Sequence, residues 1–115
     1  MNVSFQGMDQ MVVTFQAASG VQKGDFVAMS ANGTVSTAAY GDGIVGRVLN
    51  VRGGCAAVQV RGYLEAEYTG VLGLGWQDIT GQAGKVRAAG ANDDVRRCLV
   101  LSTNTTTKIA CLLLW

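Results

Sequence analysis

Residues 33–54 read GTVSTAAYGDGIVGRVLNVRGG, and the pattern returns at residues 84–105 as GKVRAAGANDDVRRCLVLSTNT. The two stretches are offset by 51 positions, and no insertion or deletion interrupts either of them. The offset places identical residues together at Gly24 and Gly75, Gly33 and Gly84, Val35 and Val86, Ala38 and Ala89, and Asp42 and Asp93. Glycines and apolar residues repeated at one spacing indicate two copies of one structural unit.

Apolar positions agree across the two stretches even where the residues differ. Ile44 falls on Val95, Val48 on Leu99, Leu49 on Val100, and Val58 on Ile109. Gly53 and Gly54 fall on Asn104 and Thr105, and both pairs separate two apolar runs. We therefore interpret residues 21–64 and 72–115 as two pseudo-repeated β units. The alternative is a chance alignment of two β sequences rich in Gly, Val and Ala.

The rest of the chain indicates an all-β fold. It contains 16 Gly and no Pro, and its short runs rich in Val, Thr and Ala are separated by Gly, Asn and Asp. No window long enough for a helix has apolar residues at three-to-four spacing. Strands are expected at residues 10–17, 25–30, 34–38, 44–51, 56–69, 76–80, 85–89, 95–102 and 108–115. The sequences ANG from Ala31 and RGG from Arg52 are expected to form hairpin turns.

Seven to nine short strands at this spacing predict a small β-barrel or β-sandwich. Residues 21–115 are expected to form a single β domain, because two units packed about a pseudo-twofold axis bury their apolar faces and protect most strand edges. Residues 1–20 are interpreted as an N-terminal arm or first strand. In this segment Phe5, Met11 and Phe15 are apolar residues beside polar neighbours. The arm either adds a strand to its own sheet or donates one to a partner.

Composition and charge limit the classes of function. The 115 residues are 49% apolar and 15% charged, and their net charge is +1. No Lys or Arg run exceeds Arg96 and Arg97, so a nucleic-acid interface is not expected, and an anionic membrane surface is disfavoured for the same reason. The start of the chain lacks the pattern of a signal peptide, and IACLLLW at its end is too short to span a bilayer. We expect a soluble chain whose charge-poor surface favours contact with other proteins.

Catalytic chemistry has little support in the sequence. The chain has no His, and Cys55, Cys98 and Cys111 lack metal-ligand spacing, so we expect no metal, no cofactor and no enzymatic activity. Cys98 and Cys111 either face each other across a hairpin or remain reduced and buried. Glu65 and Glu67 share a strand face, where exposed structural carboxylates are more common than an acid/base pair.

Two segments of the second half have alternative interpretations. GVLGLG from Gly70 lacks the Lys-Ser/Thr ending of a phosphate-binding loop, so we interpret it as the linker between the two units. Trp76 and Trp115 are expected to be core anchors or anchors of a protein interface, where Trp is enriched.

Residues 21–62, VQKGDFVAMSANGTVSTAAYGDGIVGRVLNVRGGCAAVQVRG, resemble the head decoration, or capsid cement, proteins of tailed phages. The resemblance rests on the GDFV strand, the GTV hairpin, the GD turn, the IVGR strand, the GG turn and a strand ending in Gly62. The second copy departs from this pattern, since Trp76 and Asp78 replace Asp and Val of GDFV and no glycine matches Gly46.

The resemblance implies a non-enzymatic virion protein, often trimeric, that binds the outside of an icosahedral capsid at symmetric sites and stabilises the mature shell. Its partner would be the major capsid protein, with assembly in the host cytoplasm. Candidate contacts to the capsid or to other copies are Phe5, Met11, Phe15, Trp76 and Trp115. The alternatives are a phage tail or baseplate protein, and a small β-barrel that binds oligonucleotide or saccharide, as OB-like folds do.

Overall fold

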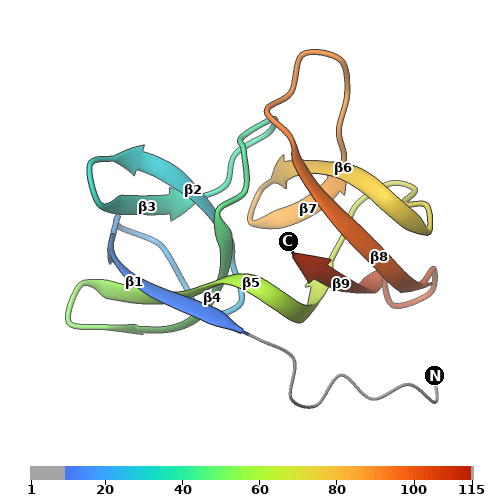
Figure 1. Cartoon of the computed structure of the whole chain (residues 1–115). Coiled ribbons are helices and arrows are strands. Elements are labelled where there is room, and N and C mark those ends of the chain that lie inside the picture. The colour runs from blue at the N-terminus through green and yellow to red at the C-terminus, as the bar shows by residue number, and fades with distance from the viewer. Residues whose placement is uncertain (1–9, 115) are drawn as a thin grey trace.

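The computed structural model describes residues 10–114, which form nine β-strands and contain no helix (Figure 1). The all-β prediction and its strand number are therefore confirmed. No helix in this described part of the chain could cross a membrane. The strands are β1 (Met11–Ala17), β2 (Phe26–Ala31), β3 (Thr34–Thr37), β4 (Gly46–Arg52), β5 (Cys55–Glu67), β6 (Gly75–Gln82), β7 (Lys85–Ala88), β8 (Arg96–Asn104) and β9 (Ile109–Leu114).

The first five strands close on themselves. They are paired in the order β1-β3-β2-β4-β5, and β1 pairs with β5 as well as with β3. The β1–β3 contact is parallel and places Ala17 opposite Val35, whereas the β1–β5 contact is antiparallel and places Phe15 opposite Ala56. Met11–Ala17 is therefore a strand of the chain's own sheet, and closure leaves this ring without a free strand at either side.

The second ring uses the far half of the same long strand. Residues 62–67 of β5 pair with β9, and the order continues through β8 and β6 to β7. A parallel bridge between Tyr68 and Val86 returns from β7 to the end of β5. In Figure 1, β5 runs between the lobe of β1 to β4 and the lobe of β6 to β9. Gly62 lies at the change of partner and has a φ of 107°, which favours glycine. The fold is thus two small barrels that share β5.

The two barrels repeat particular backbone contacts at the 51-residue offset. Ala18 N donates to Val35 O at 2.9 Å, and Thr69 N donates to Val86 O at 2.9 Å. The pairing of Phe26 with Arg47 recurs as the pairing of Gln77 with Cys98. The segment ending β5 therefore occupies the place in the second barrel that β1 occupies in the first. The repeated pairing pattern therefore includes β1, although residues 1–20, interpreted as an N-terminal arm or first strand, lie outside the two sequence units.

The expected gap-free correspondence fails at the last hairpin of each barrel. Gly53 and Gly54 form a two-residue turn between β4 and β5, whereas β8 and β9 are joined by the longer turn 105–108. Val48 pairs with Val58 in the first barrel, but Leu99, the counterpart of Val48 at the 51-residue offset, pairs with Leu113 and not with Ile109. The longer turn shifts β9 along β8, so Val58 and Ile109 are not equivalent in the structure.

Each barrel encloses apolar side chains. The first core cluster contains Val21, Val27, Val35, Val48, Ala56 and Val58. The second contains Phe26, Ile44, Leu64, Ala66, Tyr68, Leu72, Ile79, Val86, Cys98, Val100, Ala110, Leu112 and Leu114. Phe26 and Ile44 belong to the first barrel by pairing or sequence position but are buried in the second cluster. The barrels therefore share core packing as well as a strand.

Candidate interaction surface

An apolar row crosses the outer face of the second barrel. Cross-strand pairing places Tyr63 opposite Leu113, Leu113 opposite Leu99, and Leu99 opposite Trp76. The neighbours Leu64, Leu112, Cys98 and Val100 are buried in the core, so the alternation of strand faces directs the row outward. Four adjacent strands, β5, β9, β8 and β6, thus present one contiguous line of large apolar side chains, which we call the Trp76 row.

Charged and apolar groups continue the surface around Trp76. Trp76 is 50% exposed, and the preceding loop adds Leu74 at 64% and Val71 at 87%. Arg97 Nη1 lies 3.3 Å from Asp78 Oδ1, and the guanidinium carbon of Arg97 lies 5.9 Å from the Trp76 ring centroid. An apolar area bordered by charged residues is typical of a protein contact surface.

The other predicted interface residues lie elsewhere. Met11 is exposed at the start of β1, opposite Arg61. Phe15 is half-buried and packs against the first core cluster, because its strand face points into the first barrel. The candidates Phe5 and Trp115 lie outside the described residues. Of the three candidates within residues 10–114, only Trp76 lies in the apolar row across the second barrel.

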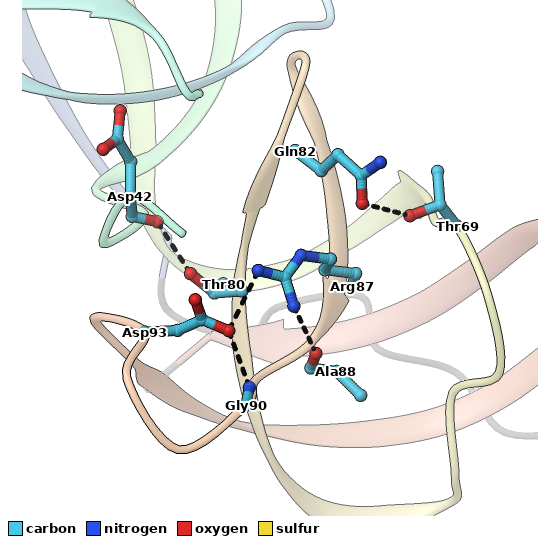
Figure 2. Close-up of polar contacts among 8 residues, drawn as sticks. All are labelled: Asp42, Thr69, Thr80, Gln82, Arg87, Ala88, Gly90 and Asp93. Carbon is cyan, nitrogen blue, oxygen red and sulfur yellow. Dashed lines mark hydrogen bonds and ion pairs between the residues drawn. The ribbon is translucent and has the colours of Figure 1, made fainter. Parts of the chain in front are cut away.

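A polar network fixes the loops where the barrels meet (Figure 2). Asp93 Oδ2 accepts a hydrogen bond from Gly90 N at 2.7 Å and lies 2.9 Å from Arg87 Nη2. Asp42 repeats the first of these contacts, because its Oδ2 accepts from Ala39 N at 3.0 Å. The Gly90 N–H is the main influence holding the pKa of Asp93 below its ordinary value; partial desolvation opposes it, and Arg87 assists.

The loop of the first barrel is anchored to the second barrel. Gly41 N donates to Gly81 O at 3.0 Å, and Gly81 N donates to Asp42 O at 2.9 Å. The Thr80 hydroxyl also donates to Asp42 O, at 3.1 Å (Figure 2). The Tyr40 ring lies 3.8 Å from the guanidinium carbon of Arg87. These contacts join the two barrels through the backbone as well as through side chains.

Arg96 makes a second connection, which sequence reasoning missed. Its Nη1 donates to Val45 O and its Nη2 donates to Val60 O, so one guanidinium on β8 bonds two carbonyl groups of the first barrel. Burial lowers the pKa of this guanidinium from its ordinary value. The sequence shows only two adjacent arginines and does not distinguish the half-buried Arg96 from its exposed neighbour Arg97.

The side chains considered for chemistry are dispersed. All three cysteines are free: Cys98 is buried, whereas Cys111 pairs with Ser102 on the outer face, so the two thiols point to opposite sides of the sheet. The Tyr63 hydroxyl donates to Cys111 Sγ at 3.2 Å, and this contact, followed by burial, raises the Tyr63 pKa to about 12. Glu67 lies 3.5 Å from Lys85 Nζ. Residues 10–114 contain no group of three or more His, Cys, Asp or Glu placed to hold a metal ion.

Comparisons with known proteins give no relative to set beside this geometry, since no family model and no curated protein matched the chain.

Proposed function

We propose that this protein is a non-enzymatic decoration protein that binds the outside of an icosahedral phage capsid at symmetric sites and stabilises the mature shell. The observation that carries the proposal is the Trp76 row, an apolar line across four strands of a rigid double barrel. The resemblance of residues 21–62 to capsid cement proteins supports the same assignment. In this proposal the partner is the major capsid protein and the chain assembles as a trimer.

The proposal assigns different roles to the two parts of the fold. The closed barrels and their shared strand supply a scaffold without long free strand edges, which suits a protein present in many copies at high local concentration. In the proposed contact, the Trp76 row contributes apolar area, and the Asp78–Arg97 pair at its border orients the protein on the capsid surface. Because β1 belongs to the first barrel, Met11 and Phe15 are not assigned to a donated strand.

Stabilisation follows from binding one state of the shell and not another. A ligand that binds the mature lattice alone stabilises it by RT ln(1 + [L]/Kd) per site, or about 2.7 kcal/mol at a hundredfold excess over Kd. Modest affinity at each of many equivalent sites is therefore enough to resist outward pressure. Binding makes and breaks no covalent bond, so the proposed mechanism requires no catalytic group.

The deciding experiment is quantitative mass spectrometry of purified particles from the source. A ratio to the major shell protein that approaches one to one supports a lattice-wide decoration protein. A few copies per particle support a tail or baseplate component instead. Absence from the particles overturns the proposal and favours a small binding module, for which binding to single-stranded DNA at low salt is the next test.

A further inference from the structure

A polar cavity of about 290 Å³ lies where the two barrels meet. The first barrel supplies the loop residues before β2 and one residue of β4, whereas the end of β5 and the turn between β6 and β7 supply the opposite wall. Its lining residues are Lys23, Gly24, Asp25, Arg47, Glu67, Ala83, Gly84 and Lys85. Neither the fold nor the proposed capsid contact uses this cavity.

The acidic side chains in the wall already have partners. Asp25 Oδ2 accepts hydrogen bonds from Gln22 N at 3.1 Å and from the Thr37 hydroxyl at 3.2 Å. Glu67 Oε2 lies 3.5 Å from Lys85 Nζ. These contacts account for both carboxylates and for one of the three basic side chains.

The remaining cations are Lys23 and Arg47. Among residues 10–114, neither has an ion pair or a side-chain hydrogen bond. Arg47 Nη2 lies 3.7 Å from the position of a Cβ built on Gly24, so the guanidinium lies close to the backbone of the cavity wall. A guanidinium that is half-buried without a counterion favours the binding of an anion from outside the chain.

Charge and shape select a carboxylate among anions. A guanidinium offers two parallel N–H donors that match the two oxygens of a carboxylate, and an ammonium nearby adds a point charge. Lys23, Arg47 and Lys85 against Asp25 and Glu67 give the lining a net charge of +1, which matches a monoanion. A phosphate monoester, with a charge of about −1.5 to −2, would be repelled more strongly by the two wall carboxylates.

The turn between β6 and β7 makes one wall of the cavity rigid. Phe26 N donates to Gly84 O at 2.9 Å, and Gly84 N donates to Ala38 O at 3.0 Å, so the turn is bonded to the first barrel. Ala83 in this turn has a φ of 49°, a left-handed conformation that is sterically unfavourable for an alanine. Backbone strain of this kind is concentrated at ligand-binding sites, where surrounding contacts hold it in place.

We infer that the cavity between the barrels is a carboxylate-binding site in which Arg47 and Lys23 hold the two oxygens. Its volume is at the lower end of the range of roughly 300–1,000 Å³ for small-molecule sites, so it suits a carboxylate on a short stem. Such a group comes either from an acidic side chain on a protein partner or from a free small acid. The inference goes beyond the capsid proposal, and its test uses the isolated full chain.

The test is a titration of the ¹⁵N-labelled chain, followed by amide chemical shifts, with acetate and with the peptides acetyl-Ala-Glu-Ala-amide and acetyl-Ala-Gln-Ala-amide. The Glu peptide is expected to shift the amides of Gly24 and Gly84, whereas the Gln peptide leaves them unchanged. Arg47→Gln and Lys23→Gln should each weaken carboxylate binding by at least about tenfold, because a hydrogen bond to a charged group contributes about 1.5 kcal/mol or more. Arg52→Gln, which removes an exposed cation from the end of β4, is the matched control and should bind as the wild type does.

The two sources of the carboxylate give different affinities. Tighter binding of the Glu peptide than of acetate supports a protein side chain, and equal binding supports a free acid; both results support a carboxylate site. The inference is overturned if neither acid shifts Gly24 and Gly84, if the Gln peptide binds as well as the Glu peptide, or if both cavity variants bind like the wild type. Urea unfolding of each variant checks that the fold is retained, so that a loss of binding is assigned to the side chain.

Discussion

Arg96 on β8 donates a hydrogen bond from Nη1 to the carbonyl oxygen of Val45 in the first barrel. Its other terminal nitrogen donates to Val60 O, so the guanidinium bonds two backbone acceptors that lie outside its own strand pairing. These contacts add a side-chain connection between the barrels to the one made by the shared strand β5. Arg96 therefore gives a direct way to measure how strongly the two barrels depend on each other.

Arg96→Met is expected to lower the free energy of unfolding by about 2–4 kcal/mol, because two carbonyl groups of half-buried residues lose a charged donor. Arg97→Met is the matched control. The Arg97–Asp78 pair has side-chain exposures of 62% and 51%, so its loss should cost less than about 1 kcal/mol. Urea denaturation of both variants measures the difference, and equal losses would show that Arg96 does not join the barrels.

Gly46→Ala should destabilise the fold more than other substitutions of glycine by alanine. A Cβ built on Gly46 lies 2.1 Å from Gln59 O and 2.9 Å from Val58 Cγ1, so β4 and β5 must separate to accept it. We expect a loss of about 3 kcal/mol or more. Gly73→Ala is the control, because its new Cβ meets the mobile end of Gln77 at 3.0 Å and should cost less than about 1 kcal/mol. Similar unfolding midpoints for the two variants would contradict this account.

The strands were predictable because local signals set them. Alternating apolar residues and positive-φ glycines fixed most strand bounds to within a residue or two, and Gly33, Gly53 and Gly54 do adopt positive φ in their turns. The closure of each barrel was not predictable in this way. The bridge from Ala17 to Val35 and its counterpart from Tyr68 to Val86 lie at equivalent positions, but only the Val residues are identical. The sequence similarity between the two units therefore does not extend to β1 and the end of β5, which close the barrels.

The candidate sites were less accessible to sequence reasoning for a different reason. Residue type alone makes Trp76 a candidate core or interface anchor, but Leu99 and Leu113 join it only through the cross-strand register. Arg47 and Lys23 meet Lys85 only because the β6–β7 turn is bonded to β2. Both arrangements depend on contacts between residues far apart in the chain, which no local spacing rule reports.

Ala83→Gly is expected to stabilise the protein. Ala83 has a φ of 49°, and glycine adopts this conformation without steric cost, so the variant should gain about 0.5–1 kcal/mol despite its larger unfolded-state entropy. Ala31→Gly, at the end of β2 in the first barrel, has no positive φ to relieve and should instead lose about 0.5 kcal/mol. Thermal unfolding of both variants measures whether each substitution raises or lowers stability. A loss of stability in Ala83→Gly would contradict the backbone strain inferred at Ala83.

Stability should fall in alkaline solution through Cys98. Burial raises the pKa of this thiol to about 11, above its ordinary value near 9. Because the pKa of Cys98 is higher in the folded state than in the unfolded state, its contribution to the free energy of unfolding is fully present below about pH 9. It is lost as the pH rises toward about 11, for a total of about 3 kcal/mol. Cys98→Ala should flatten the unfolding free energy in this window, whereas Cys55→Ser, which changes an exposed thiol, should retain the wild-type slope. An unchanged slope in Cys98→Ala would assign the decline to other groups.

Trp76→Ser should weaken binding to expanded capsid shells while leaving the barrels folded. Trp76 is 50% exposed at one end of the Trp76 row, so its removal from a buried contact is expected to cost about 2 kcal/mol or more, which is over tenfold in affinity. Met29→Ser is the matched control, because Met29 is 49% exposed but lies on β2 of the first barrel. Co-sedimentation with shells that lack the native protein measures both affinities, and circular dichroism checks both folds. A selective loss in Trp76→Ser assigns the contact to the second barrel, whereas a loss confined to Met29→Ser would move the contact to the first barrel and overturn the role of the Trp76 row.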